Sequence, residues 1–467
     1  MLAAERIAGY YRHPAVRSRI AEYCGGGEPF PARFSAAGLA GFGGWRELRG
    51  ADTAPVPVAV ADWRHLFEDG ADVHRSLADR GGTLIQLDVD YVNPEDPGEP
   101  YRAPAACFER LEPVYRAVQE AWAGFGVTTI VLMTGRGYHF TARAPRGSSL
   151  HDELVGIARL NPALGARYRF EEAREPLAVS MGVAHDGAGR LVEHLAHDVV
   201  RALRGRTGVP VTAADVPPSG RGPFICLDVT AYGDPLFSRY ARCAFSSHQK
   251  AAWAGREPDP LFVATLPRGA RGLETLLAVR SDPGAAAALA DSASARIPDV
   301  SDAPRWIRAY RESALARFHR RFDSARPATT LAADAYAHIA PDTLPKCVRI
   351  ALESPNPVLL VPTTLRAVTL VLWGRGWPLP RVADLIRSRY EADHGWGGLW
   401  QRYEAAARAD FYVRLFAGLV VDGLDDFSDF TCASQQGRGG CPGGDCGHEL
   451  RWFFPDAARV RALSAAS

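Results

Sequence analysis

Length, composition and charge limit what this chain can be. With 467 residues, 47% of them hydrophobic, it can bury two or three cores. Its formal charge of +1 excludes a general attraction to nucleic acid, so any such binding must use local patches. Lysine occurs only at positions 250 and 346, neither within a Gly-Lys-Ser/Thr context, which excludes a P-loop nucleotide site.

The sequence has no feature of a secreted or membrane protein. Residues 1–6 lack the apolar core of a signal peptide. The most apolar stretch, between Val358 and Trp373, is interrupted by proline and arginine, so no segment reaches membrane-spanning length. We therefore expect a cytoplasmic protein without a membrane partner.

The first expected strand carries two acidic residues side by side. Residues 83–91 alternate from Ile85 onward, with apolar side chains on one face and Gln86, Asp88 and Asp90 on the other. Side chains two apart on a strand point the same way, so Asp88 and Asp90 are neighbours. Two ionised carboxylates repel unless a cation lies between them, and Mg²⁺ or Mn²⁺ prefers such oxygen ligands. An ordinary exposed edge strand is the alternative interpretation.

A glycine-rich turn follows the next strand. Residues 128–133 form an apolar run typical of a buried strand, residues 134–139 read Thr-Gly-Arg-Gly-Tyr-His, and another strand begins at Phe140. Two glycines in a tight turn can aim backbone N–H groups at an anion, with Arg136 and His139 as further donors. A simple hairpin turn would have the same pattern.

A third strand contains an acid and leads into a basic segment. Residues 223–229 are apolar except for Asp228. Hydroxyl and basic side chains follow at Ser238, Arg239, Arg242, Ser246, Ser247, His248 and Lys250. An acid followed by such a cluster suits a metal-bound triphosphate, and a solvated basic loop is the alternative. Arginine replaces lysine almost everywhere in this chain. The lysine at position 250 therefore indicates a site that needs a compact ammonium group.

Helices and a linker complete the expected organisation. Helices are expected at 110–124 and 189–204, and residues 281–304, rich in alanine and proline, are expected to be a linker. One helix should follow, with start signals at Asp302 and Pro304. Its buried stripe would consist of Ile307, Tyr310, Ala314, Phe318 and Phe322. We therefore divide the chain into a domain at 1–290, a linker and connecting helix at 291–330, and a helical domain at 331–467.

The eight cysteines fall into two groups. Those at 24, 107, 226 and 243 have apolar or small neighbours and are expected to be buried. The second group is Cys347, Cys432, Cys441 and Cys446, of which the last three lie in a glycine-rich segment that cannot form its own core. Disulfides are rare in the cytoplasm, so a metal is the better support. Four thiolates fit an iron–sulfur centre, and zinc with His448 as the fourth ligand is the alternative.

The order of the acidic, glycine and basic motifs resembles the archaeo-eukaryotic primase superfamily. Residues 10–12 and 19–23 also look like the opening of primase small subunits. The resemblance implies an α+β catalytic domain with an RNA-recognition-like (RRM-like) sheet, in which Asp88, Asp90 and Asp228 hold two Mg²⁺ or Mn²⁺ ions. It implies nucleotide binding by Thr134, Gly135, Arg136, Gly137, His139, Arg242, Ser247, His248 and Lys250, with Arg239 as good a candidate as Arg242.

The C-terminal third resembles the corresponding domain of primase large subunits. The resemblance rests on Leu344–Cys347, on helical segments at 365–373 and 381–390, and on the cysteines at 432 and 441. It implies a mainly α-helical domain around a [4Fe–4S] cluster bound by Cys347, Cys432, Cys441 and Cys446. The last three cysteines are separated by eight and then four residues, which is tighter than in that family, so zinc stays an alternative.

Together the two resemblances imply a DNA primase-polymerase of a bacterial, plasmid or phage replicon. It would synthesise and extend primers on single-stranded DNA from NTPs or dNTPs, with a separate helicase as a candidate partner. Tyr138, or a residue near it, is a candidate for the residue that distinguishes ribose from deoxyribose. Two alternatives stay open: a repair polymerase that only extends existing ends, and a nucleic-acid end-binding protein whose catalytic site has decayed.

Overall fold

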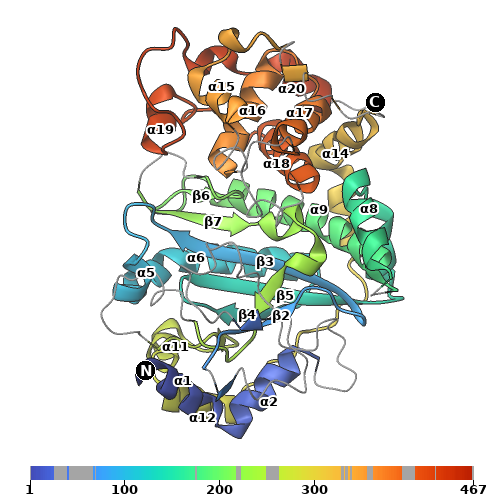
Figure 1. Cartoon of the computed structure of the whole chain (residues 1–467). Coiled ribbons are helices and arrows are strands. Elements are labelled where there is room, and N and C mark those ends of the chain that lie inside the picture. Colours follow the sequence, from blue (N-terminus) through green and yellow to red (C-terminus); the bar gives the residue numbers. More distant parts are fainter. Residues whose placement is uncertain are drawn as a thin grey trace.

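A mixed sheet lies between two helical layers (Figure 1). The computed structural model describes residues 2–25, 39–40, 67–68, 70–173, 176–216, 222–248, 262–327, 331, 335–336, 339–354, 361–391, 405–425 and 427–464. Within these residues the fold is α+β, with N-terminal helices at one end of the sheet and C-terminal helices at the other.

The main sheet has six strands in the order β6-β7-β3-β5-β4-β9, and only the β6–β7 pair is parallel. Its strands are β3 (Gly82–Val92), β4 (Ile130–Met133), β5 (Gly137–Pro145), β6 (Val211–Thr212), β7 (Phe224–Asp228) and β9 (Leu266–Pro267). A small antiparallel sheet consists of β1 (Leu39–Ala40), β2 (Val73–Ser76) and β8 (Tyr240–Arg242). The strands expected at 83–91, 128–133, 223–229 and from residue 140 are confirmed to within a few residues.

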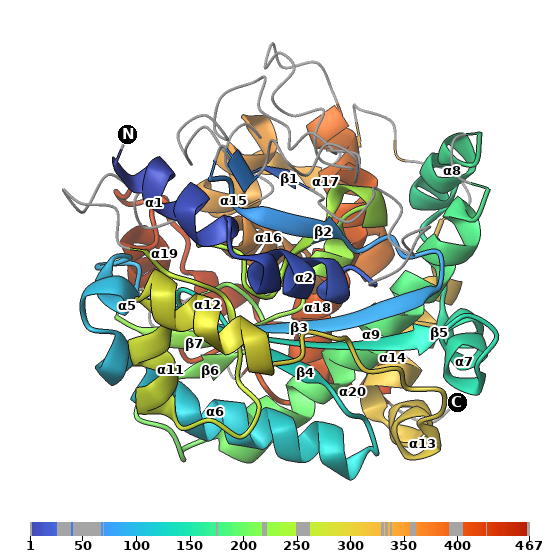
Figure 2. The same ribbon diagram turned by 90° about the horizontal axis from the view of Figure 1, so that it is seen from below.

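Helices surround the sheet on both faces. The N-terminal part contains α1 (Leu2–Tyr11), α2 (Pro14–Tyr23), α5 (Glu99–Arg102), α6 (Pro104–Gly124), α7 (Ser149–Ile157), α8 (Pro162–Glu171), α9 (Ala178–Leu203), α11 (Leu273–Arg280) and α12 (Pro283–Ser292). In Figure 2, α6 and α9 lie on one side of β3 and β5, and α2 and β2 lie on the other. The two helices expected at 110–124 and 189–204 are confirmed as α6 and α9, which begin earlier than predicted.

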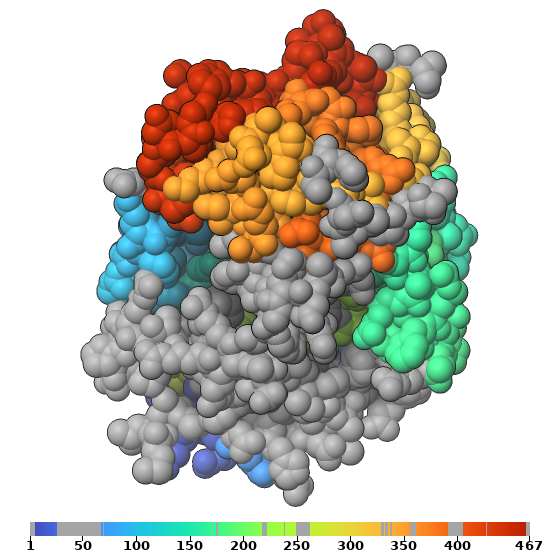
Figure 3. All heavy atoms as spheres, turned by 45° about the horizontal axis from the view of Figure 1, so that its top comes forward, coloured from blue at the N-terminus to red at the C-terminus, as the bar shows by residue number. Residues whose placement is uncertain are grey.

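The C-terminal part is helical. It contains α13 (Pro304–Glu312), α14 (Ala314–Ser324), α15 (Lys346–Glu353), α16 (Pro362–Gly374), α17 (Leu379–Glu391), α18 (Ala405–Val421), α19 (Cys432–Gly437) and α20 (Ala457–Ser464). Short 3₁₀ turns include η2 (Thr230–Gly233), η3 (Leu236–Ser238), η5 (Pro341–Thr343) and η7 (Leu450–Phe453). In Figure 3 the orange and red C-terminal segments form one continuous surface that meets the green segment around α8.

The segment that we expected to be a linker is ordered and packed. Helix α12 occupies 283–292, begins with Asp282 as its N-cap, and packs against α2. Beyond it, Arg143 of β5 forms a bridge with Asp299 and an ion pair of 2.6 Å. The single helix expected after residue 302 is also wrong, because it breaks at Ser313, whose hydroxyl caps the second helix, α14. Several alanines of this segment, among them Ala286 and Ala290, are buried.

Helix α9 is shared by the sheet and the C-terminal helices. It packs on β3, and its other side faces α13, α14 and α18. Burial alone would raise the pKa of Glu193, but His319 and Arg414 from those helices lower it to about 2. Arg190 pairs with Asp323 at 2.8 Å. The buried apolar side chains accordingly form one continuous cluster, from Ile7 to Leu450.

Small residues let neighbouring elements approach α9 closely. A Cβ at Gly187 would overlap the carbonyl oxygen of Leu154 in α7. A Cβ at Gly189 would lie 2.7 Å from Cβ of Tyr232, in η2. These glycines are therefore contact points, and the distances from α9 to α7 and to η2 depend on them. Of the helices that the structure describes, none is both long and apolar enough to cross a membrane.

We predict that Gly187→Ala destabilises the fold by about 1–3 kcal/mol, because α7 must move away from α9. Gly156→Ala is the matched control: it lies in α7, with open space around the new methyl group. It should be neutral or stabilise by about 0.5–1 kcal/mol, as alanine does in helices. Urea unfolding of both variants measures the difference, and equal effects would contradict the close helix contact.

Candidate active site

Four of the predicted side chains lie on one face of the main sheet. Asp88 in β3 is directly opposite Asp228 in β7 and His139 in β5. Residues directly opposite each other across strands share a face, and so do residues two apart, which adds Asp90. Strands β7, β3 and β5 lie side by side (Figure 1). Their register therefore places three carboxylates and an imidazole in two adjacent rows.

The carboxylate of Asp88 is the centre of this group. Gln86 donates from Nε2 to its Oδ1 at 2.8 Å, and Nε2 of His139 lies 3.7 Å from the same oxygen. Burial raises the pKa of Asp88 to about 6; Asp90 and Asp228 add to the rise, and His139 and Gln86 oppose it. Removing charge from this carboxylate, or supplying a cation, would therefore relieve an unfavourable interaction.

The other two acids have partners of their own. Asp90 accepts a hydrogen bond from Arg136, and Oδ1 of Asp228 accepts from the backbone N–H of Thr230 at 2.8 Å. As they stand, no three His, Cys, Asp or Glu side chains in the described ranges are close enough to hold a metal ion. The donor set fits a hard divalent cation, because three carboxylates face one side of the sheet, and the pKa of Asp88 is raised by burial and further by Asp90 and Asp228.

The glycine turn is tight and is supported from behind. The backbone N–H of Thr134 donates to the carbonyl of Gly137 at 2.8 Å. A Cβ at Gly137 would overlap the carbonyl oxygen of Val89, so this strand can approach β3 only with glycine there. Arg280 of α11 donates to the carbonyl oxygens of Thr134 and Gly135 at 2.8 and 3.2 Å. No local pattern marks this buried arginine as part of the turn.

Part of the basic segment lies beside the turn. A Cβ at Gly135 would be 2.6 Å from the imidazole of His248, so the two residues are in contact. Arg242 pairs with the buried Asp72 at 2.5 Å and donates to the carbonyl of Ser247 at 2.7 Å. The Ser247 hydroxyl donates to Asp72 at 2.7 Å. Asp72 was not predicted, and Lys250 lies outside the described residues.

The structure distinguishes the two candidate arginines. Arg239 donates to the carbonyl of Thr230 at 2.8 Å and pairs with Asp234, so it supports the turn after Asp228. Arg242 lies with His248 and Ser247 instead. Arg242 is therefore the better candidate for contact with an anion beside the glycine turn.

Two tyrosines near the turn differ from expectation. Tyr138 is completely buried on the opposite face, where its hydroxyl donates to Glu112 at 2.7 Å, so it does not face the acids. It cannot contact a sugar bound there, which corrects the prediction. Tyr101 of α5 was missed: its ring lies 5.9 Å from that of His248, and its buried hydroxyl has no hydrogen-bond partner among the described residues. Burial raises its pKa to about 12, and nearby Arg136 opposes that rise.

The four C-terminal cysteines gather from two segments. Burial raises the pKa of Cys347 to about 12, and the nearby thiols of Cys441 and Cys432 add to the rise. The thiols of Cys432 and Cys446 both reach the carbonyl oxygen of His448, at 3.7 and 3.8 Å. As these side chains stand, no three of them could hold a single ion.

The loop that carries these cysteines is built from glycines. Its φ angles lie between +72° and +84° at Gly439, Gly443, Gly444 and Gly447, a region that other residues rarely adopt. The Lys346 ammonium group donates to the carbonyl of Gly443 at 3.3 Å. Four thiols around a wrapped loop fit a cluster with thiolate ligands. The other four cysteines are buried, as predicted.

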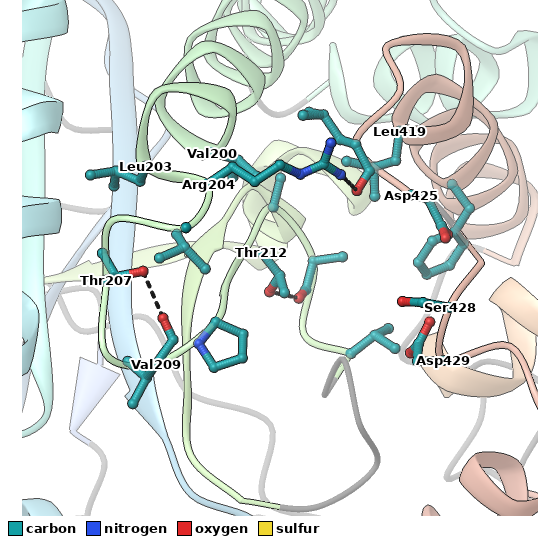
Figure 4. A pocket seen from close by; sticks show the side chains of 18 of the residues that line it. Val200, Leu203, Arg204, Thr207, Val209, Thr212, Leu419, Asp425, Ser428 and Asp429 are labelled. Carbon is teal, nitrogen blue, oxygen red and sulfur yellow. Dashed lines mark hydrogen bonds between the residues drawn. The ribbon is translucent and has the colours of Figure 1, made fainter.

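A cavity of about 440 Å³ lies elsewhere, between the segment around β6 and the C-terminal part (Figure 4). Its walls include Leu203, Val209 and Leu419. Of its two arginines, Arg366 pairs with Asp425 at 2.8 Å, and Arg204 donates to the carbonyl of residue 424 at 3.3 Å. Both arginines of the cavity are thus bonded to groups of its own wall, and Asp425 and Asp429 add negative charge there.

We predict that the contribution of Asp88 to the stability of metal-free protein is lost as pH rises from about 4 to about 6, since folded Asp88 holds its proton more tightly than the unfolded chain does. Asp88→Asn should remove this loss and raise the melting temperature at pH 8 by a few degrees, with no difference at pH 4. Mn²⁺ should raise the melting temperature of the wild type at pH 8 but not that of the variant.

The control is Asp152→Asn, at a side chain that is 76% exposed. It should melt like the wild type at both pH values. A shift for Asp88→Asn that is the same at pH 4 and pH 8 would contradict the electrostatic interpretation.

Comparison with known proteins assigns no family to this chain. No protein-family model, no curated protein and no solved structure matches it. The function of the site therefore rests on its residues and their geometry.

Proposed function

We propose that the chain is a DNA primase-polymerase that transfers nucleotides by a two-metal mechanism. The observation that carries the proposal is the row formed by Asp228, Asp88 and His139 across three adjacent strands, with Asp90 beside it. Three acids on one face, next to a glycine turn and arginines, suit a metal-bound triphosphate. The mixed main sheet, with α6 and α9 packed against β3, is compatible with a primase-like catalytic fold.

Each residue has a definite task in this proposal. When bound by Asp88, Asp90 and Asp228, two Mg²⁺ or Mn²⁺ ions would acidify the attacking 3′-hydroxyl and neutralise phosphate charge. Asp90 would exchange its bond to Arg136 for that role. The freed guanidinium group of Arg136 would then be available to the triphosphate.

The nucleotide would bind along the basic side of the row. Arg242, His248 and His139 would position the phosphates by charge-assisted hydrogen bonds, with Lys250 and Ser247 as further candidates. Tyr101 lies beside His248, and its buried hydroxyl has no hydrogen-bond partner among the described residues. Single-stranded DNA would serve as template, and a separate helicase could supply it.

The cysteine centre is proposed to hold a [4Fe–4S] cluster, with zinc as the alternative. The support is the approach of Cys347 to Cys432 and Cys441, with Cys446 beside Cys432. A role in binding the template and the initiating nucleotide rests on the resemblance alone.

The first test offers unprimed single-stranded DNA, labelled nucleotides and Mn²⁺ to the purified chain. The wild type should make dinucleotides and longer products, whereas Asp88→Asn and Asp228→Asn should lose at least about 10³-fold, as when a group that acts in the transition state is removed. The control is Asp291→Asn, at an exposed acid of α12, which should keep full activity.

Other outcomes would select an alternative function. Extension of primed ends without dinucleotide synthesis would favour a repair polymerase. Binding of DNA ends with no incorporation under any metal would favour a decayed site and would contradict the proposal.

The second test concerns the cysteines. Anaerobically purified protein should be brown, with broad absorption near ~400 nm and about four iron atoms per chain, because thiolate-bound iron–sulfur clusters have these properties. Cys347→Ser should lower the iron content sharply. Cys107→Ser should not, since Cys107 is buried in α6, among its apolar residues. A colourless protein with one zinc ion per chain would replace the cluster by zinc.

A further inference from the structure

The turn that follows Asp228 is gripped by a helix from the C-terminal part. Asp234, directly after η2, is buried and accepts two hydrogen bonds from Arg408 of α18. The distances are 2.7 Å from Nε to Oδ1 and 2.9 Å from Nη2 to Oδ2. This is a bidentate pair between guanidinium and carboxylate, the geometry that orients both partners most strictly.

Packing reinforces this ion pair. A Cβ at Gly233, the last residue of η2, would lie 2.8 Å from Cδ1 of Phe411, one turn further along α18. The helix therefore rests directly on the backbone of the turn. The pKa of Tyr412, the next residue, is raised by burial and further by Asp228 and Asp234, so α18 also lies close to the third acid itself.

The η2 turn positions two of the three acids, Asp228 and Asp88. The backbone N–H of Thr230 donates to Oδ1 of Asp228 at 2.8 Å, and Arg239 fixes the carbonyl of Thr230. Strand β7 ends at Asp228, opposite Asp88, so Gln86 extends beyond the end of this partner. The hydroxyl of Tyr232 replaces that partner, bonding both the N–H and the carbonyl of Gln86 at 2.9 Å.

The contact continues from Gln86 to Asp88. The amide of Gln86 donates to Oδ1 of Asp88 at 2.8 Å. Because Tyr232 fixes the Gln86 backbone and Thr230 fixes Asp228, a displacement of η2 would move both carboxylates.

We infer that α18 is a positioning element of the active site, acting through Arg408, Asp234 and the η2 turn on Asp228 and Asp88. The inference rests on the proposed function. It assigns the C-terminal part a task apart from the cysteine centre: it sets the geometry in which the acids bind divalent cations. Arg408 touches neither cation nor nucleotide in this scheme.

The experiment measures Mn²⁺ binding to the full chain by electron paramagnetic resonance, without nucleotide. Arg408→Gln should weaken Mn²⁺ binding by about 10-fold or more, as is typical when a residue supporting metal ligands is removed. In nucleotide incorporation it should lower kcat and raise the Mn²⁺ concentration for half-maximal rate. Arg408→Lys keeps the positive charge but loses the two-pronged guanidinium group. Its affinity for Mn²⁺ should lie between those of the wild type and Arg408→Gln.

The matched control is Arg326→Gln. Arg326 pairs with Asp410, also in α18, at 2.6 Å, and within the described part of the chain it forms no hydrogen bond or ion pair with the η2 turn. It should bind Mn²⁺ like the wild type. Equal weakening in both variants, or none in Arg408→Gln, would overturn the inference.

A second variant covers the case in which Arg408→Gln does not fold. Gly233→Ala pushes Phe411 away from the turn without removing a charge, and should also weaken Mn²⁺ binding while circular dichroism shows an intact fold. Normal Mn²⁺ binding by this variant would overturn the inference. If the wild type and Arg408→Gln incorporate nucleotides equally well, the inference is overturned and the proposed function is not. If the wild type neither binds Mn²⁺ nor incorporates nucleotides, both the inference and the proposed function are overturned.

Discussion

The pairing register of β3 between β5 and β7 is the constraint on which the site depends. Side chains alternate along a strand. A slip of one residue would therefore turn Asp88 and Asp90 toward α6 and α9 and bring apolar residues to the face that now carries the acids. Gly137 helps to prevent such a slip, because only a residue without Cβ fits against the carbonyl of Val89. Tyr232 holds the next position by bonding the Gln86 backbone where β7 has ended.

Electrostatics adds a second level of organisation to this register. Burial, and after it repulsion from Asp90 and Asp228, raises the pKa of Asp88 on one face of the sheet, and arginines lie at the border of this group. Arg136 neutralises Asp90, and Arg242 neutralises Asp72. The chain has nearly equal numbers of acidic and basic residues, so this local pairing, and not net charge, determines where an anion or a cation could bind.

Local pattern was enough to predict some of this and not the rest. The alternation in β3 places Asp88 and Asp90 on one face whatever the fold, but the position of Asp228 opposite Asp88 depends on register, which no local pattern encodes. The role suggested for Tyr138 failed for a reason visible in the sequence, since adjacent strand residues such as Tyr138 and His139 face opposite sides. The partners Arg280 and Arg408 lie 146 and 174 residues from the groups that they contact, so only the folded chain reveals them.

The position of helix α9 affects whether the two parts of the chain can be produced separately. One of its sides is covered by the sheet and the other by α14 and α18, with Arg190 and Glu193 bonded to groups from the C-terminal part. Cutting the chain near residue 300 would leave these charged side chains without their counter-ions and would expose a large apolar surface. Either part expressed alone should therefore expose this apolar surface and aggregate.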